Sequence, residues 1–189
     1  MNRRAEMRQA ARADAFGPIS VAERTLTAER TQWIGLSLVV VAAVAADQVT
    51  KHVVASSLAL DADLNLVGPF SIHHVQNSGI AFGLFSSATP VVIALTTVAV
   101  AWMLIFFARS GARHPALPVA LGLLIGGSVS NLVDRVRLGY VTDFLDLRFW
   151  PAFNLADSCI VAGVALLLAA LLLADRSPRR RADTSTARP

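Results

Sequence analysis

The amino-acid sequence predicts an all-α polytopic membrane protein, with four transmembrane helices, a small extracytoplasmic β-sheet and a short re-entrant or amphipathic segment. The chain of 189 residues is 54% hydrophobic and 16% charged, and its mean hydropathy of +0.56 is too high for an ordinary soluble domain. It contains four apolar runs close to the roughly 20 residues that a helix needs to cross a bilayer. Most of its arginines lie near the two ends.

This charge distribution divides the chain into three parts. Residues 1–32 carry six Arg and four acids, and residues 175–189 carry five Arg and two Asp, so we expect both to be disordered, Arg-rich cytoplasmic segments. Residues 33–174 hold six basic and seven acidic residues and form the expected four-helix membrane domain. Because most basic residues lie outside that domain, we expect no nucleic-acid partner. No small-residue cleavage site follows the first apolar run, which is therefore expected to remain as an anchor.

Each predicted helix has a distinct character. The first carries Asp47, Gln48 and Lys51 in its second half, whereas the second has no charged residue in its apolar run. The third is rich in Gly and Ser, and the spacing of Gly122 and Gly126 favours close packing of membrane helices. The fourth ends in a Leu/Ala stretch. The four helices are expected at about 33–56, 88–108, 115–133 and 152–174.

The connector after the first helix predicts both the sheet and the re-entrant segment. Residues 64–75 show strand-like alternation flanked by turn residues, which predicts a small sheet. Residues 77–85 are apolar but broken by glycine, and they are too short to span the bilayer. Non-helical backbone at membrane depth is tolerated only against protein or a wet cavity, so we expect this segment to re-enter the membrane or lie at its surface.

The placement of arginine predicts the orientation. The loop after the second helix contains Arg109, Arg113 and His114 without an acid, and the C-terminal tail is rich in Arg. The positive-inside rule places this loop and both termini in the cytoplasm, an arrangement that four crossings satisfy. Residues 57–87 and 134–151 would then face the outside.

Three aspartates fall at this predicted outer face. Asp47 lies in the first apolar run, Asp143 between the third and fourth runs, and Asp157 at the start of the fourth. An ionisable side chain within a spanning helix costs roughly 2.5–3.5 kcal/mol on insertion scales, so it indicates a functional site.

Asp143 and Asp157 are the candidate catalytic pair. Two carboxylates that face one cavity tend to share a proton, which suits peptide hydrolysis: one activates water, while its protonated partner polarises the carbonyl and protonates the leaving amine. Such a reaction requires no metal. The competing interpretations are that Asp143 is a solvated loop acid and that Asp157 pairs with Asn154 to cap the fourth helix.

The other polar residues near this face have mainly structural interpretations. Asp134 shares a helix face with Asn131, and it is either an ionised structural acid or the rival for a catalytic role. Arg135 is suited to holding a carboxylate or a lipid phosphate. Asp47 and Lys51 are four residues apart in acid-before-base order, which favours an ion pair on a helix. Amide side chains suited to hydrogen-bonding a substrate backbone are Asn77, Asn131 and Asn154.

Several functional classes lack support in the sequence. The single cysteine, Cys159, excludes an internal disulfide and a four-cysteine metal site, and no metalloprotease, serine-hydrolase or phosphate-loop motif occurs, so we expect no metal and no cofactor. A small transporter or channel would spread its charges through the membrane depth, but these acids cluster at one face. A structural subunit would leave the paired acids without a role.

Five sequence blocks occur in a defined order along residues 33–174. They are Asp47-Gln48-Val49-Thr50-Lys51, Asn77-Ser78-Gly79-Ile80-Ala81-Phe82, Gly126-Gly127 through Asn131-Leu132-Val133-Asp134-Arg135, Val141-Thr142-Asp143-Phe144 and Phe153-Asn154-Leu155-Ala156-Asp157-Ser158. Together they resemble the lipoprotein signal peptidases (signal peptidase II) of bacteria. Ser130 and Thr142 stand where that family usually has Gly and Val, and both are small enough to fit.

The resemblance implies a membrane aspartyl endopeptidase that removes the signal peptide from diacylglyceryl-modified prolipoproteins, just before the lipidated cysteine. The family's catalytic aspartates match Asp143 and Asp157. The implied partners are a lipidated prolipoprotein and membrane lipids, and we expect a monomer in the bacterial inner membrane with its active site at the extracytoplasmic face. The supporting positions match Asp47, Lys51, Asn77, Gly79, Asn131, Asp134, Arg135, Asn154 and Ala156.

Overall fold

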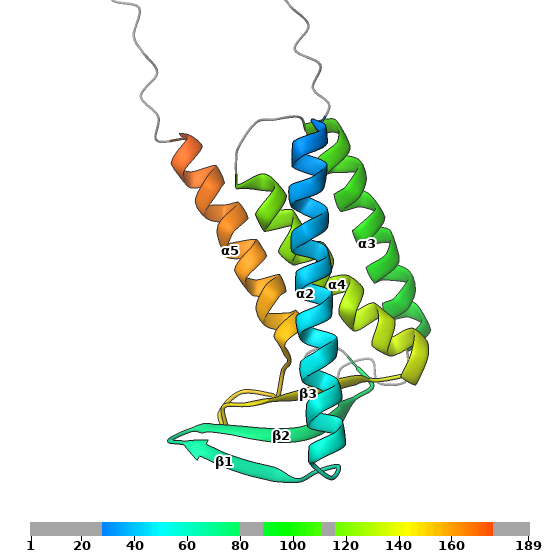
Figure 1. The fold of residues 1–189 in the computed structure, drawn as a ribbon, viewed down its shortest axis with the longest axis vertical. Coiled ribbons are helices and arrows are strands. Elements are labelled where there is room, and N and C mark those ends of the chain that lie inside the picture. The colour runs from blue at the N-terminus through cyan, green and yellow to red at the C-terminus, as the bar shows by residue number, and fades with distance from the viewer. Residues whose placement is uncertain (1–27, 80–88, 111–115, 176–189) are drawn as a thin grey trace, which may run out of the picture.

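A computed structural model describes residues 28–79, 89–110 and 116–175. Within these ranges it contains four helices that are long and apolar enough to cross a membrane, which confirms the predicted fold class. The elements in chain order are α2 (Arg30–Ser57), β1 (Asp63–Val67), β2 (Phe70–Asn77), α3 (Thr89–Ser110), α4 (Leu117–Leu138), β3 (Val141–Asp146) and α5 (Leu155–Asp175). Figure 1 shows the helices side by side, with the three strands at one end.

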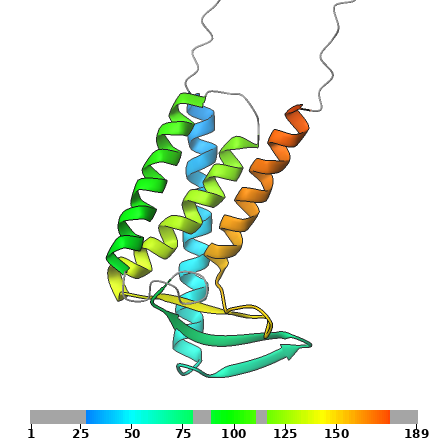
Figure 2. The same ribbon diagram turned by 180° about the vertical axis from the view of Figure 1, so that it is seen from behind.

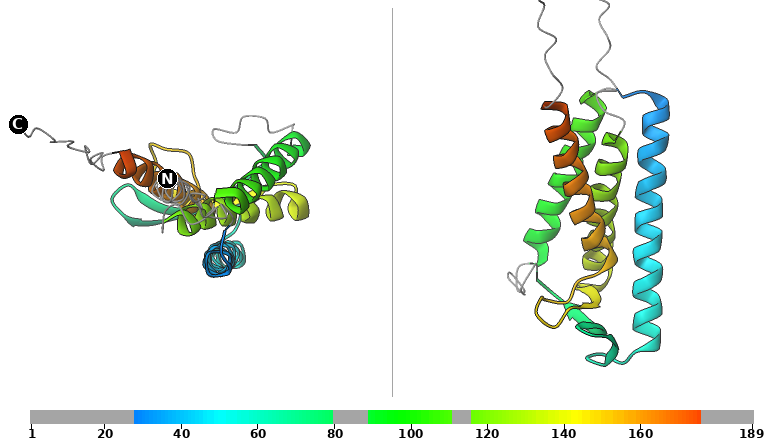
Figure 3. Two further views of the ribbon diagram at one scale, coloured as in Figure 1. Left: turned by 90° about the horizontal axis from the view of Figure 1, so that it is seen from above. Right: turned by 90° about the vertical axis from the view of Figure 1, so that its left-hand side faces the viewer.

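α4 is the central helix of the bundle and packs against α2, α3 and α5. Figure 2 shows α3, α4 and α5 in front of α2 when the molecule is seen from behind. The views in Figure 3 show these three helices as a layer with α2 on one face of it. Most of α4 is buried, whereas α2, α3 and α5 expose many apolar side chains, as lipid-facing helices do.

Glycines allow α4 to approach its neighbours closely. A Cβ atom added to Gly122 would lie 2.7 Å from Val39 Cβ, and one added to Gly126 would lie 2.8 Å from Ala43 Cβ. These two glycines therefore serve packing against α2, in line with their spacing. Gly127 contacts the other neighbour, since its added Cβ would lie 2.4 Å from the carbonyl oxygen of Ala156 on α5.

α4 extends further than the sequence suggests. Its end was expected near Val133, but the helix continues to Leu138 and includes Asp134, which was expected to share a helix face with Asn131. Gly139 has a φ of 83°, a left-handed conformation that favours glycine, and its N–H donates to the carbonyl of Arg135. The helix ends there, and the chain enters β3 two residues later.

The predicted sheet has three antiparallel strands in the order β1-β2-β3. β1 and β2 lie in the segment expected to be strand-like, but β3, which carries Asp143, was not expected as a strand. Asn77 on β2 pairs with Val141, and Val75 pairs with Asp143. Asn77 and Asp143 are therefore diagonal neighbours on one face of the sheet.

The chain returns to β3 before α5 begins. The N–H of Leu145 donates to the carbonyl of Phe153 at 2.7 Å, and the N–H of Phe153 donates to the carbonyl of Leu145 at 3.0 Å. This closure brings Asn154 and the start of α5 back beside Asp143, although Asp143 and Asp157 are fourteen positions apart in the sequence.

Three predictions concern segments outside the described residues. The two terminal segments that were expected to be disordered lie almost entirely outside the described residues. Most of the expected re-entrant segment also lies outside them, and its first residue, Asn77, belongs to β2. In Figure 1 the start of α2 and the end of α5 lie at the end of the bundle opposite the sheet, as four crossings require.

Candidate active site

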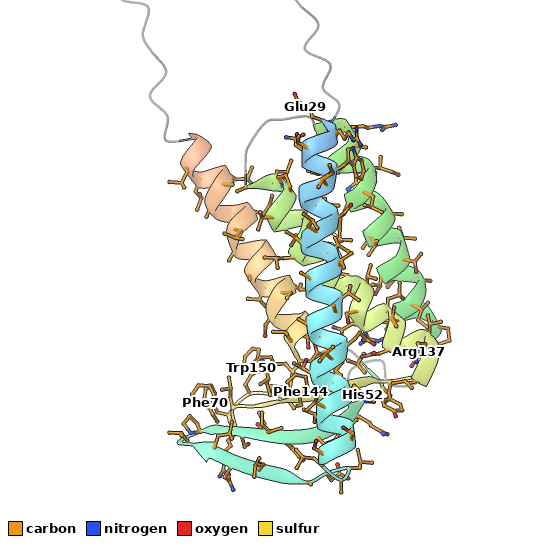
Figure 4. All side chains as sticks on the ribbon, viewed as in Figure 1. Glu29, His52, Phe70, Arg137, Phe144 and Trp150 are labelled. Carbon is orange, nitrogen blue, oxygen red and sulfur yellow. The ribbon has the colours of Figure 1, made fainter. Side chains whose placement is uncertain are left out.

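Asp143 and Asp157 line one cavity of about 500 Å³ between the sheet and the start of α5. In Figure 4 Trp150 lies beside the end of α5 nearest the sheet, and Phe70 lies at the sheet's outer part. The cavity has a polar and an apolar side. Its polar lining includes Gln76, Asn77, Ser78, Asp143 and Asp157, and its apolar lining includes Val75, Trp150, Phe153, Ile160 and Val161.

Asp143 is buried, with 2% of its surface exposed, so its interpretation as a solvated loop acid is wrong. Its Oδ1 accepts a hydrogen bond from Nδ2 of Asn154 at 2.7 Å, and its Oδ2 accepts one from Nδ2 of Asn77 at 2.8 Å. Burial raises the pKa of Asp143 to about 6, against the opposing effect of the Asn77 hydrogen bond. This carboxyl group is therefore suited to holding a proton near neutral pH.

Asp157 and Asn154 together cap the start of α5, and Asp157 also belongs to the site. The N–H of Asp157 donates to Oδ1 of Asn154 at 2.9 Å, and the N–H of Asn154 donates to Oδ2 of Asp157 at 3.2 Å. The capping interpretation thus describes the geometry, but it does not account for the whole side chain. Oδ1 of Asp157 also accepts from Nδ2 of Asn131 at 2.8 Å, and Asp157 lines the cavity.

The three asparagines expected to bind a substrate backbone contact the two carboxylates. Asn77 donates to Asp143, Asn131 donates to Asp157, and the Asn154 amide donates to Asp143. Each carboxyl oxygen accepts one such bond from an amide side chain or backbone N–H, which leaves a lone pair for a water or a shared proton.

A buried ion-pair cluster lies next to this pair. Nζ of Lys51 lies 2.7 Å from Oδ2 of Asp47 and 2.6 Å from Oδ2 of Asp134, and it donates to Oδ1 of Asn131 at 2.8 Å. The ion pair expected from the spacing of Asp47 and Lys51 is confirmed. Asp134 has the geometry of the ionised structural acid rather than that of a member of the cavity lining.

Asp47 connects three helices. Besides Lys51 on its own helix, it accepts from the Ala156 N–H on α5 at 2.8 Å and from Oγ of Ser130 on α4 at 2.7 Å. Ser130, which departs from the family's usual Gly, also accepts from Nε2 of Gln48 at 3.0 Å, and Gln48 donates to Asp134. Sequence reasoning did not assign these roles to Ser130 or Gln48. The one available signal was a polar residue beside Asp47 in an apolar run.

Arg135 and Gly79 fix the chain that follows β2. Nη2 of Arg135 donates to the Gly79 carbonyl at 2.7 Å, and Nη1 donates to the Asn131 carbonyl at 3.4 Å. These two nitrogens of Arg135 therefore contact backbone oxygens. The N–H of Gly79 in turn donates to Oδ1 of Asn77 at 3.0 Å.

The aromatic wall of the cavity was not predicted. Trp150 and Phe153 lie in the loop between β3 and α5, and their position follows from the return of the chain at Phe153. No group of three His, Cys, Asp or Glu side chains that could hold a metal ion occurs within residues 28–79, 89–110 and 116–175.

The fold and the site together define a multi-pass membrane protein with an acidic cavity at one end of its helix bundle. Residues 39–173 match the family model described as signal peptidase (SPase) II. The lipoprotein signal peptidase of Symbiobacterium thermophilum is 43% identical over 148 residues, which cover 75% of this chain and 97% of that protein. That of Moorella thermoacetica is 41% identical over 130 residues, covering 68% of this chain and 87% of the relative.

A solved structure described as a bacterial membrane enzyme, determined by the in meso method at 2.3 Å resolution, has the same fold. It has a TM-score of 0.71 and 27% sequence identity, and the match covers 84% of this chain and 98% of that one. The chain therefore belongs to the signal peptidase II family and is a peptidase.

Proposed function

We propose that this protein is a membrane aspartyl endopeptidase that removes the signal peptide from diacylglyceryl-modified prolipoproteins, just before the lipidated cysteine. The observation that carries the proposal is that two carboxyl groups, the buried Asp143 and the partly buried Asp157, open onto one cavity and accept hydrogen bonds from neutral groups. The names of the relatives support the choice of a lipoprotein precursor as substrate.

In this proposal Asp157 is the base and Asp143 is the acid. Asp157 lies at the first turn of α5 and accepts a backbone N–H, and the helix dipole favours an anion there. Burial raises the pKa of Asp143 to about 6, and we assign the shared proton to this carboxyl group because it lacks the helix dipole that favours an anion at Asp157.

The reaction is then a direct hydrolysis. Asp157 takes a proton from a water whose oxygen bonds to the scissile carbonyl carbon, while Asp143 donates its proton to the carbonyl oxygen. The tetrahedral intermediate collapses as its C–N bond breaks, and a carboxyl proton passes to the leaving amine. A hydroxyl proton of the intermediate returns to the pair as the carbonyl re-forms. The pair is then ready for another cycle, and no acyl-enzyme forms.

The location of the cavity suits a lipid-anchored substrate. Its apolar wall includes Ile160 and Val161 of α5, and Val161 is 69% exposed on the helix surface that would contact lipid. A precursor with an acyl chain on one side of the scissile bond and an apolar signal helix on the other can reach such a site by lateral diffusion. Anchoring by lipid lowers the entropic cost of positioning the bond.

We further infer the orientation from the arginines. With both termini in the cytoplasm, the sheet and the cavity face the outside of a bacterial inner membrane. The peptidase domain is residues 33–174, flanked by cytoplasmic segments at 1–32 and 175–189, and the enzyme acts as a monomer without a cofactor.

Cleavage of a purified precursor tests this function. Full-length protein is reconstituted in vesicles and incubated with a diacylglyceryl-modified prolipoprotein or with the same precursor lacking the lipid. We expect cleavage of the lipidated form alone, with the new N-terminus at the modified cysteine as read by mass spectrometry. Equal cleavage of both forms would show a general signal peptidase instead.

A further inference from the structure

The three amides that contact the acid pair must each have one particular orientation. An asparagine amide has an acceptor oxygen and a donor NH₂ on one planar group, and a half-turn exchanges them. Only the orientation that directs NH₂ at the carboxylate is attractive. Each amide oxygen must therefore be held by a separate hydrogen-bond donor, and these donors set the geometry of the site.

Two of the three donors are backbone groups. The oxygen of Asn77 accepts from the N–H of Gly79 two residues later, and the oxygen of Asn154 accepts from the N–H of Asp157 in the first turn of α5. Both contacts are local in sequence, so the chain conformation itself provides them.

The third amide is held by a side chain from another helix. Oδ1 of Asn131, on α4, accepts from Nζ of Lys51, on α2, at 2.8 Å and from Nδ2 of Asn154 at 3.1 Å. These two bonds use both lone pairs of that oxygen, and the NH₂ of Asn131 is then directed at Asp157.

The contacts and the burial of the Lys51 side chain fix its ammonium group in this position. Its three N–H bonds have three close acceptors, namely Asp47, Asp134 and Asn131. Only 5% of Lys51 is exposed, so water does not compete for the ammonium group. If Asn131 turned over, its NH₂ would face this cation and its oxygen would face Asp157, and both contacts would be repulsive.

We propose that Lys51 is a positioning residue of the peptidase: its ammonium group sets the orientation of the Asn131 amide and, through the shared oxygen, that of Asn154. The inference rests on the proposed function. Lys51 does not line the cavity, so it acts through the two amides and not on the substrate. Removing it lowers kcat and leaves KM nearly unchanged, because substrate contacts stay in place while the acids lose their alignment.

The variant that tests this must keep the local charge constant. Lys51→Met alone would leave Asp47 and Asp134 buried without their cation, which would destabilise the fold. The double substitution Lys51→Met/Asp134→Asn removes one positive and one negative charge, so the cluster keeps a net charge of −1. The matched control is Asp134→Asn, which retains both Lys51 and its bond to Asn131.

The measurement is steady-state cleavage of the lipidated precursor by full-length proteins in vesicles, with thermal unfolding in detergent to match the folded fraction. For Lys51→Met/Asp134→Asn we expect kcat to fall about 100-fold, the scale of loss for a misplaced catalytic group, with KM within about twofold of the wild-type value. For Asp134→Asn we expect a fall of less than about tenfold. Equal kcat values in the two proteins, or a loss confined to KM, would overturn the proposal.

A double-mutant cycle with Asn131→Leu distinguishes a positioning role of Lys51 from a role in stabilising the fold. If Lys51 acts through Asn131, the Lys51→Met/Asp134→Asn change lowers kcat about 100-fold in the wild-type background and less than about threefold in the Asn131→Leu background. If the change lowers kcat by the same factor in both backgrounds, the proposal is overturned. Asn131→Leu with Lys51 intact also tests it without any change to the ion pairs, because full activity in that variant would contradict the role of the amide.

Failure of this inference is distinct from failure of the proposed function. If the wild-type protein does not cleave the lipidated precursor, the proposed function is wrong. If the wild-type protein cleaves and the charge-balanced variant is as fast as its control, the function stands and the role assigned to Lys51 is wrong.

Discussion

Four aspartates lie at the same end of this molecule, three of them buried and Asp157 partly buried, and their carboxylates find partners of two different kinds. Asp47 and Asp134 share the ammonium group of Lys51, at 2.7 Å and 2.6 Å. Asp143 and Asp157 accept only from amide side chains and a backbone N–H among the hydrogen bonds found for the described residues. The first pair has a fixed counter-charge at contact distance, and the second pair has none within the part of the chain that the structure describes.

This difference separates structural acids from reactive ones. A carboxylate paired with a buried cation stays ionised, because protonation would leave that cation alone in a low-dielectric site. A carboxylate held by neutral donors can take up or release a proton at a moderate cost, as the pKa of about 6 for Asp143 indicates. Asp143 is as buried as Asp47 and Asp134, so burial alone does not identify a reactive acid, whereas the charge of its partners does.

The largest expected effect is on the neutral-donor pair. Asp143→Asn and Asp157→Asn should each lower kcat by about 10³-fold or more, because each removes one of the two groups that handle the proton. The double substitution should lose no more than either single one, since the pair acts as a unit. The measurement is cleavage of the lipidated precursor. Losses that multiply in the double variant would mean that the acids act independently.

Substitution of an ion-paired acid should affect stability more than activity. Asp47→Ala removes one of the two carboxylates on Lys51 and leaves the Ala156 N–H without its acceptor, so we expect a loss of about 3 kcal/mol in the free energy of unfolding. Thermal unfolding in detergent measures it, with Asp143→Asn as the comparison, for which we expect a smaller loss. A similar loss in both would contradict the division into two regions.

The stability of the folded protein should depend on pH through Asp143. Its pKa is raised from 3.8 to about 6, so the folded protein holds this proton more tightly than the unfolded chain does. The resulting stability is fully present below pH 3.8 and is lost as the pH rises through about 6, and it corresponds to about 3 kcal/mol.

The measurement compares unfolding of the wild-type protein and Asp143→Asn between pH 4 and pH 7. The wild-type protein should lose stability relative to the variant as the pH rises over this range. Parallel curves would show that Asp143 does not titrate in the folded protein as described.

The smallest expected effect concerns the contact that places α5 beside α4. A Cβ on Gly127 would lie 2.4 Å from the Ala156 carbonyl oxygen, so Gly127→Ala should destabilise the protein by about 1–3 kcal/mol and shift Asp157 relative to Asn131. Gly35→Ala is the matched control, because its nearest atom would be 3.9 Å away, and we expect no loss of stability or cleavage there. Equal stability and equal cleavage in the two variants would show that this contact does not control the placement of α5 beside α4.

Much of this fold follows from local sequence. The four apolar runs predict the helices, and the alternation in residues 64–75 predicts strand structure there, because both depend on periodicity within one segment. The Asp47–Lys51 pair also follows, since residues four apart share a helix face.

The arrangement of the site depends on contacts that no local pattern contains. β3 was not expected because its six residues read as a short connector, and Asp143 is held there by pairing with β2 and by the return at Phe153. Likewise, the amide of Asn131 is oriented by Lys51 from another helix, 80 positions away. The acids themselves could be found in the sequence through the resemblance, but the partners that separate the two pairs could not.

The most direct test of this division is the cleavage rate of two isosteric variants at equal amounts of folded protein. Asp143→Asn and Asp134→Asn each replace one buried acid with its amide, at the same end of the molecule. We predict that Asp143→Asn loses about 10³-fold or more in kcat on the lipidated precursor, while Asp134→Asn loses less than about tenfold. Comparable losses in the two variants, or the larger loss in Asp134→Asn, would contradict the assignment of Asp143 to the reactive pair.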